Sequence, residues 1–312
     1  MEAAMASQNQ ITNLFEVSMI ADALGVPVEF RPRDSYHVSD MTGHGTYDQP
    51  VGSWSDDSSL TLCLAETLTE GGGPTQLMQK FTAYLDGDYT PHGIRFDIGI
   101  GTSEAISRFN TGHVPATEAG SRLANANGNG ALMRIAPLAF ALDGQNWRDR
   151  RQRITDFTTV THGHERSIIA SCLYVETLRQ LLAGQALAEA LKQASQLVHQ
   201  GDFRAEEFAY FDRVLNPDFF ATPRDQIRSS GYVIDSLEAA VWCAANAASV
   251  QDLILTAANL GEDTDTIAQI AACLYAAGHL DEQAPAQWRK ALIQTKQSRR
   301  IITDFAQKFG EQ

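Results

Sequence analysis

The chain has 312 residues, of which 44% are hydrophobic and 20% are charged, values ordinary for a globular protein. This length suffices for one large domain or two smaller ones. The formal net charge of −14 argues against a nucleic acid or an anionic membrane as partner, because both are bound through basic surfaces. No stretch approaches the ~18 uninterrupted apolar residues of a transmembrane helix, so we expect no membrane partner.

Four cysteines, Cys63, Cys172, Cys243 and Cys273, lie scattered in apolar stretches without a CxxC pair. This pattern indicates buried, reduced thiols and a cytoplasmic location rather than a disulfide framework. The N-terminus lacks the basic flank and apolar run of a signal peptide. Residues 1–10 are small and polar, and we expect them to form a flexible N-terminus.

Apolar residues recur at helical spacing over most of the chain from Ile11 onward. Apolar residues recur on one face from Ile11 to Gly25, where a C-terminal glycine and the following Pro27 end the helix. Residues 31–54 are rich in glycine and proline, and predict a long loop of the functional kind. Further helices are predicted at 57–70, 75–86, 100–110, 131–141, 147–160, 164–183 and 185–200.

Residues 201–229 are irregular and aromatic, and contain Pro217 and Pro223. They predict a second long loop rather than a linker between domains, because linkers are seldom this aromatic. Helices follow at 234–247, 250–259, 265–277, 284–293 and 298–309, and alternating strand patterns are almost absent. The sequence therefore predicts a single all-α domain over residues 11–312.

Two short acidic runs are the most informative feature of the sequence. They are Ser55-Asp56-Asp57-Ser58 and Asp263-Thr264-Asp265-Thr266, and each leads directly into an apolar helical stretch. The simplest interpretation is that each run caps a helix, because side-chain oxygens accept the free backbone N–H groups of a first turn. A cap needs only one acceptor, however, and each run offers several.

Four carboxylates gathered in one place would repel one another and raise each other's pKa. One or two divalent cations would remove that cost. All the donors would be oxygens, with no histidine or cysteine in either run, which favours Mg²⁺ or Mn²⁺ over Zn²⁺. Because four acidic groups match the charge of two such ions, the residues predict a binuclear centre for two Mg²⁺, with Mn²⁺ as the alternative.

Five segments, in this order, resemble the ADP-ribosylglycohydrolase family. They are residues 21–30, 52–58, 127–134, 231–240 and 260–266, within a similarity that spans roughly residues 11 to 280. The second and fifth segments together are highly specific, whereas each of the others alone is weak. The resemblance implies an all-α fold with two Mg²⁺ or Mn²⁺ ions, and hydrolysis of the bond between ADP-ribose and its acceptor, most often an arginine of a modified protein.

Site residues follow from this resemblance position by position. The implied metal ligands are Ser55, Asp56, Asp57, Asp263, Asp265 and Thr266, and we also count Asp56 and Asp265 among the catalytic residues. The implied partners are an ADP-ribosylated protein as substrate and ADP-ribose as product; a cognate ADP-ribosyltransferase is a partner under the immunity alternative given below. An attraction for phosphate would have to come from metals and local N–H groups, because the overall charge is negative.

Two further carboxylates are implied at the site. Glu29 could be a solvated surface residue, but the resemblance places it at the metals as a gate or as a general acid/base. Asp97 could simply cap the next helix, and the resemblance places it against the ribose of the substrate. The chain departs from the family beside it: an asparagine often follows Gly99, and this chain has Ile100. A hydrogen bond to the substrate is therefore in doubt, and with it the acceptor preference.

A glycine-containing turn is the candidate phosphate site. It comprises Asn127, Gly128, Asn129 and Gly130, and we expect it to precede a helix start, where backbone N–H groups can approach a pyrophosphate. A plain turn is the alternative. His162 is either a structural histidine or a residue near the substrate, and Tyr232 is either a core aromatic or a contact of adenine or ribose.

The expected reaction is hydrolysis of an N-glycosidic bond. Glu29 or a metal-bound carboxylate would handle the proton, and a route through an opened ribose with Asp97 as acid/base is equally compatible. Three alternatives stay open at this point: an immunity protein that neutralises an ADP-ribosyltransferase toxin by hydrolysis or by blocking it, a non-catalytic binding or structural protein on the same scaffold, and a phosphoester hydrolase with the same metals.

Overall fold

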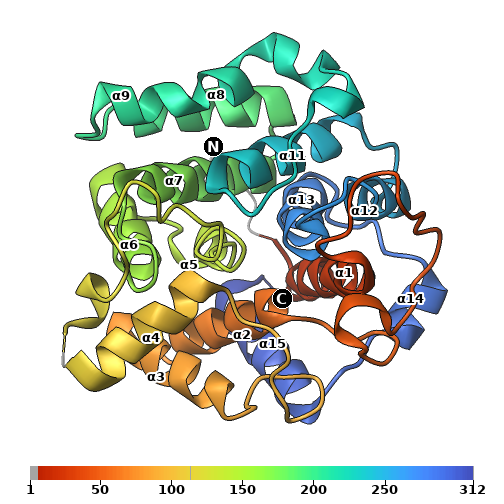
Figure 1. Cartoon of the computed structure of the whole chain (residues 1–312). Helices are drawn as coiled ribbons and strands as arrows, with labels where there is room; N and C mark the ends of the chain where they lie inside the picture. Colours follow the sequence, from red (N-terminus) through yellow and green to blue (C-terminus); the bar gives the residue numbers. More distant parts are fainter. Residues whose placement is uncertain (1–5, 113, 312) are drawn as a thin grey trace.

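The computed structural model describes residues 6–112 and 114–311. Over these residues it contains α-helices, short 3₁₀ helices and four isolated β-bridges, and no β-strand (Figure 1). The prediction of an all-α fold is confirmed. The buried apolar side chains form one connected cluster that runs from Ala6 to Ala306.

Two helices from opposite ends of the chain form the centre of the fold. Helix α1 (Gln8–Gly25) packs along α13 (Thr264–Gly278), and every residue of α13 from Thr264 to Ala277 is buried. Helices α11 (Val233–Asn246) and α12 (Val250–Ala258) pack against α13 as well (Figure 1). The N-terminus of α13, where the second acidic run lies, is therefore held inside the protein.

The remaining helices form two groups around this centre. Helix α2 (Asp56–Thr69) packs against α15 (Lys296–Phe309) and α3 (Pro74–Leu85), and α4 (Ile100–Gly112) packs on α3. Helix α7 (Glu165–Leu182) packs against α13, α5 (Leu138–Ala141), α6 (Trp147–Thr159) and α8 (Leu187–Val198). The short α14 (Ala286–Ala291) lies beside α1.

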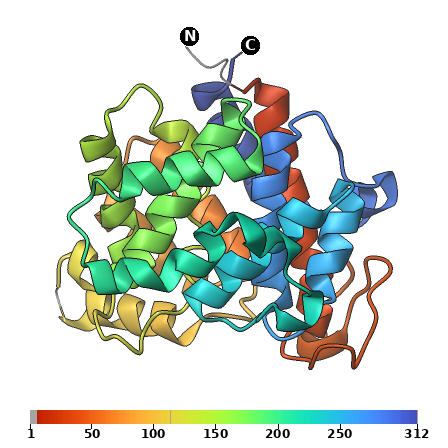
Figure 2. The same cartoon turned by 90° about the horizontal axis from the view of Figure 1, so that it is seen from above.

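The N-terminal segment is more ordered than the sequence suggested. Ser7 forms a capping box with Gln10, so that α1 begins at Gln8, and residues 8–10 belong to the helix rather than to a flexible end. Residues 1–5 lie outside the described part. The backbone of Gln8 donates to Glu311 at 3.0 Å, and the two ends of the chain lie side by side (Figure 2).

Helix α1 with its extension to Val28 is long and apolar enough, by length and composition alone, to cross a membrane. Within the protein, 83% of the most apolar window is buried. The apolar character is explained by packing against α13, α12 and α15, as in the core helix of an all-α fold.

The predicted helix 131–141 is wrong over most of its length. Residues 131–137 form successive turns, and only Leu138–Ala141 is helical. Pro137 lacks an N–H and disfavours a helical conformation at Ala136. The guanidinium of the fully buried Arg134 donates instead to the carbonyls of Gly130 and Phe157, which fixes this segment as a compact turn.

The aromatic segment 201–229 is also more regular than a loop. It contains α9 (Ala205–Phe208), α10 (Asp212–Leu215) and three short 3₁₀ helices at Ala209–Phe211, Pro217–Ala221 and Arg224–Gln226. Phe208, Phe211 and Phe219 are buried, so the aromatic residues anchor the segment on the helical core. The other predicted helices agree with the structure to within a few residues at each end. The four cysteines are buried and free, as predicted.

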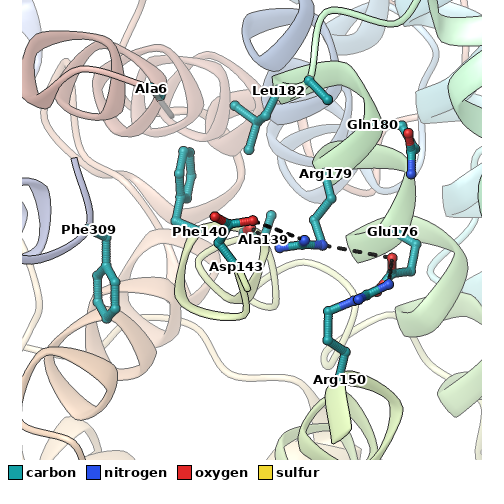
Figure 3. A pocket seen from close by; sticks show the side chains of 11 residues that line it. Ala6, Ala139, Phe140, Asp143, Arg150, Glu176, Arg179, Gln180, Leu182 and Phe309 are labelled. Atoms are coloured by element: carbon teal, nitrogen blue, oxygen red, sulfur yellow. Dashed lines mark hydrogen bonds and ion pairs between the residues drawn. The ribbon is translucent and has the colours of Figure 1, made fainter. Parts of the chain in front are cut away.

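A cavity of about 140 Å³ lies between α5, α6 and α7, next to Ala6 and Phe309 (Figure 3). On its wall the buried Glu176 carboxylate accepts two hydrogen bonds from Arg150, at 2.7 and 2.8 Å. Arg179 lies 3.8 Å from the same carboxylate and 3.2 Å from Asp143. This ion-pair cluster joins α6 to α7.

Removing the charge of Glu176 should destabilise the fold. Glu176→Gln would leave the guanidinium groups of Arg150 and Arg179, whose side chains are 12% and 16% exposed, without their buried counter-charge. We expect the free energy of unfolding, measured in urea, to fall by about 3 kcal/mol. Asp143→Asn, at a side chain that is 57% exposed, is the control and should cost well under half of that. Equal losses in both variants would contradict this interpretation.

Candidate metal centre and substrate cavity

The two acidic runs meet in space. The first forms the N-terminus of α2 and the second the N-terminus of α13. The Thr266 hydroxyl donates to Oδ2 of Asp57 at 3.0 Å, across 209 positions of sequence. Ser55 donates to the same oxygen at 3.1 Å. The predicted ligands therefore converge on one buried place.

Gly25, at the C-terminal end of α1, allows this close approach. A Cβ atom at Gly25 would lie 2.3 Å from Cα of Asp265 and 2.4 Å from its backbone nitrogen. The Gly25 carbonyl also accepts a hydrogen bond from the Thr264 hydroxyl at 2.9 Å. Because only a glycine fits there, α1 sets the position of the second acidic run.

Capping explains only part of the two runs. The Ser55 hydroxyl caps α2 by accepting from the backbone N–H of Asp57 at 3.2 Å. Asp263 occupies the corresponding position at α13 but makes no side-chain cap. Its carboxylate accepts instead from the Asn129 amide at 2.6 Å. The carboxylates that are not needed as caps face one another.

Asp22 of α1 is a member of this acidic cluster that the sequence analysis did not assign. Its buried carboxylate accepts from the backbone N–H groups of Ser55 and Ser58, at 3.0 and 3.1 Å, and from the Ser58 hydroxyl at 2.5 Å. Oxygens of Asp22, Asp57 and Asp265 lie within 4.8 Å of one another. Burial raises the pKa of Asp22 to about 6.

Three carboxylate oxygens in this region are buried and accept no hydrogen bond. They are Oδ1 of Asp57, Oδ2 of Asp265 and Oε2 of Glu29. Burial, reinforced by repulsion from neighbouring carboxylates, raises the pKa of Asp56, Asp57 and Asp265 well above the ordinary value. Converging oxygens without donors are what a hard divalent cation requires, so the residues present fit Mg²⁺ or Mn²⁺.

Glu29 and Asp97 stand at the edge of the acidic cluster, and oxygens of both lie within 4.8 Å of one from Asp265. Burial, with repulsion from Asp97 and Asp263, raises the pKa of Glu29 to about 9. The Tyr47 hydroxyl lies close to Glu29 and Asp97, and it opposes part of the rise in the pKa of each. The two predicted catalytic carboxylates thus lie side by side, next to a tyrosine of the 31–54 segment.

A cavity of about 350 Å³ opens above the cluster. Asp56, Asp263 and Thr266 of the acidic runs lie on its wall together with Glu29 and Asp97. Among the residues that the structure describes, no lysine or arginine lines it. The remaining wall comes from residues 98–102, 128–130, Phe30, Met133, His162 and Gly231.

Two glycines, Gly101 and Gly130, bring the backbone of two segments close to the His162 ring. A Cβ atom at Gly101 would lie 3.2 Å from Nε2 of His162, and one at Gly130 would lie 3.0 Å from its Cε1. Burial, with a smaller effect of Arg134, lowers the pKa of His162 to about 3, so the imidazole is neutral at physiological pH. Its Nδ1 lies 2.8 Å from the Thr161 hydroxyl. His162 thus lines the cavity as an uncharged group.

The other predicted substrate residues divide into two sets. Gly128, Asn129 and Gly130 line the cavity, but the helix start expected behind them is absent, so no helix dipole assists a phosphate there. Asn127 is not on the cavity wall, and its side chain contacts the Ala124 carbonyl and the Ser167 hydroxyl. Tyr232 is not on the wall either, and its hydroxyl accepts from Arg166 at 3.0 Å.

Fold and site together define an all-α protein with an oxygen-only acidic centre beneath an open cavity. A family model described as ADP-ribosylglycohydrolase matches residues 8–312, and the chain belongs to this family. Family membership makes the protein a glycosidase, in agreement with the resemblance found in its motifs.

Curated relatives and a solved structure agree with this assignment. An ADP-ribosylarginine hydrolase Tri1 of Pseudomonas putida (strain GB-1) is 32% identical over 283 residues, which cover 86% of this chain and 70% of that protein. The protein of the same name from Serratia proteamaculans (strain 568) is 33% identical over 290 residues, covering 88% and 73%. A structure titled ADP-ribosylglycohydrolase-related protein complex is 28% identical, with a TM-score of 0.78 and 96% coverage of both chains.

Gly25→Ala should disturb the acidic centre through packing alone. The added methyl group must push α1 away from α13 at Asp265, so we expect a lower melting temperature and a divalent-ion affinity reduced roughly 10-fold or more. Gly278→Ala is the matched control at the other end of α13, where the new Cβ would meet Leu181 at an ordinary 3.6 Å. Calorimetry and metal titration of both variants test this, and a normal affinity in Gly25→Ala would refute it.

Divalent cations should stabilise the protein against heat. They would neutralise carboxylates that are buried without donors, so saturating Mg²⁺ or Mn²⁺ should raise the melting temperature on the order of 5 °C relative to a chelator. Asp57→Asn and Asp265→Asn should abolish the rise. Asp48→Asn, at a side chain that is 86% exposed, should keep it. A wild-type protein that shows no shift with either ion would refute a metal centre at this place.

Proposed function

We propose that the protein hydrolyses the N-glycosidic bond between ADP-ribose and an arginine of a modified protein, and that it requires Mg²⁺ or Mn²⁺. The observation that carries the proposal is the convergence of two acidic runs, with three donor-free buried oxygens, beneath a cavity. The curated relatives, which are named ADP-ribosylarginine hydrolases, support the choice of acceptor.

The charge of the cavity favours a cationic acceptor. Four carboxylates, those of Glu29, Asp56, Asp97 and Asp263, lie on its wall, and the described lining residues include no lysine or arginine. The guanidinium group of a modified arginine would be attracted to Glu29 and Asp97 at the edge of the cluster. A neutral serine or an acidic acceptor would gain nothing from the same groups.

The cations would be held by Ser55, Asp56, Asp57, Asp263, Asp265 and Thr266, the residues whose oxygens converge at the ends of α2 and α13. When bound, they would supply Lewis-acid and template chemistry for the ribose hydroxyls next to the scissile bond. Asp22 would hold the first turn of α2 in place through its hydrogen bonds to Ser55 and Ser58.

The protein's own carboxylates would transfer the protons. A water molecule adds to the anomeric carbon as the C–N bond breaks, so one proton must leave the water and one must reach the departing guanidine nitrogen. Glu29 has a free buried oxygen on the cavity wall, and bound cations would lower its raised pKa, so that the ionised carboxylate could perform the first task. Asp97, which lies beside Glu29 and has a raised pKa, suits the second, or the acid/base role in a route through an opened ribose.

Product analysis on defined substrates tests the proposal. Wild-type enzyme with Mg²⁺ or Mn²⁺ should release ADP-ribose, identified by mass spectrometry, from a protein modified on arginine and not from one modified on serine. We expect a chelator, Asp56→Ala and Asp265→Ala each to lower the rate at least roughly 100-fold, with Asp48→Asn as the control. Full activity of Asp56→Ala or Asp265→Ala in excess chelator would refute the proposal, and phosphate release instead of ADP-ribose would point to a phosphoester hydrolase.

A further inference from the structure

Large apolar side chains are exposed at several places on the surface, and two of them lie at the mouth of the cavity. In the described part of the chain six such side chains stand out, namely Phe30, Val51, Ile94, Ile100, Leu123 and Tyr210. Phe30 and Ile100 are 67% and 80% exposed, and both line the cavity. We call Phe30 and Ile100 the apolar rim.

Phe30 is held outward by its backbone. Its φ angle is +63°, a left-handed conformation that is unfavourable for a bulky residue. Two hydrogen bonds fix it there: the N–H of Phe30 donates to the carbonyl of Glu262 at 2.6 Å, and the N–H of Glu262 donates to that of Arg31 at 2.9 Å. Glu262 itself has a φ angle of +62°. A strained pair of this kind persists only where surrounding structure imposes it.

The rim is tied to the acidic centre by direct contacts. The Phe30 ring packs edge-on against Tyr47, with 6.4 Å between centroids, and the Tyr47 hydroxyl lies close to Glu29 and Asp97. Ile100 is the first residue of α4, and the N–H of the preceding Gly99 donates to Asp56 at 3.2 Å. Whatever contacts the rim is therefore held at a fixed distance from the carboxylates.

We propose that the apolar rim docks the surface of the modified protein, and that it selects arginines with an apolar side chain beside them in the acceptor. This inference rests on the proposed function. The cavity would enclose the ADP-ribosyl group, so the acceptor chain has to emerge at the mouth and meet the rim. A free ADP-ribosylarginine has nothing to cover these side chains, whereas a protein surface does. With a net charge of −14, the enzyme also favours a basic acceptor surface.

The experiment varies both the enzyme and the residue beside the modified arginine of the substrate. Wild type, the rim variant Ile100→Ser and the control Leu123→Ser, at a residue that is 67% exposed but does not line the cavity, are compared on three substrates. These are free ADP-ribosylarginine and two ADP-ribosylated peptides that differ only in Leu or Ser beside the modified arginine. In wild type and the control, we expect kcat/KM for the Leu peptide to exceed that for the Ser peptide roughly 10-fold, mainly through KM. The rim variant should lose this preference.

The possible outcomes distinguish failure of the docking proposal from failure of the proposed function. Equal use of the Leu and Ser peptides by the wild type, or a preference kept by the rim variant, would overturn the docking proposal and leave the proposed function intact. A wild-type enzyme that releases ADP-ribose from none of the three substrates would instead overturn the proposed function, and the docking proposal with it. A concentration-dependent wild-type dimer that the Ile100→Ser substitution dissociates, seen by sedimentation, would assign the rim to a second copy of the chain and overturn the docking proposal.

Discussion

The contact between the end of α1 and the start of α13 is the constraint on which the site depends. At Gly25 the two backbones approach so closely that no side chain fits, and the Thr264 hydroxyl bonds to the Gly25 carbonyl. One turn earlier on α1, Asp22 holds the first turn of α2. A single helix therefore positions both acidic runs, although they are separated by more than two hundred residues. Backbone packing therefore sets where the acidic side chains lie.

The clustering of buried carboxylates at this contact is electrostatically unfavourable for the fold. Five buried carboxylates, those of Asp22, Asp56, Asp57, Asp263 and Asp265, lie together, and burial raises the pKa of each. Hydrogen bonds from Ser55, Ser58, Asn129 and Thr266 offset part of this cost, but oxygens of Asp57 and Asp265 are left without donors. A fold without a cationic ligand would gain stability by replacing such residues, so their presence together is a functional signal rather than a packing solution.

Local patterns in the sequence were sufficient for the helices and for the acidic centre, because periodicity and capping residues act over one or two turns. They failed at 131–141, where Pro137 and the buried Arg134 impose turns on an apolar stretch that has helical periodicity. They also missed Asp22 and Tyr47. Asp22 sits on a helix face that resembles any core face, and Tyr47 lies in a loop without periodicity. Only the tertiary fold brings these two residues to Ser55, Glu29 and Asp97, so no local pattern could assign them.

An acidic protein and the two phosphates of the proposed substrate repel each other unless the cavity supplies positive charge. Its described wall offers no cationic side chain, and His162 is held neutral by burial. The glycine-containing segments 99–101 and 128–130 instead bring backbone to the wall, and a Cβ atom at Gly101 or Gly130 would come within 3.2 Å of His162. Attraction for an anion must then come from N–H groups and from cations held by the acidic runs. Metal binding and substrate binding would therefore be coupled, since the same cations would offset both the buried carboxylates and the incoming phosphates.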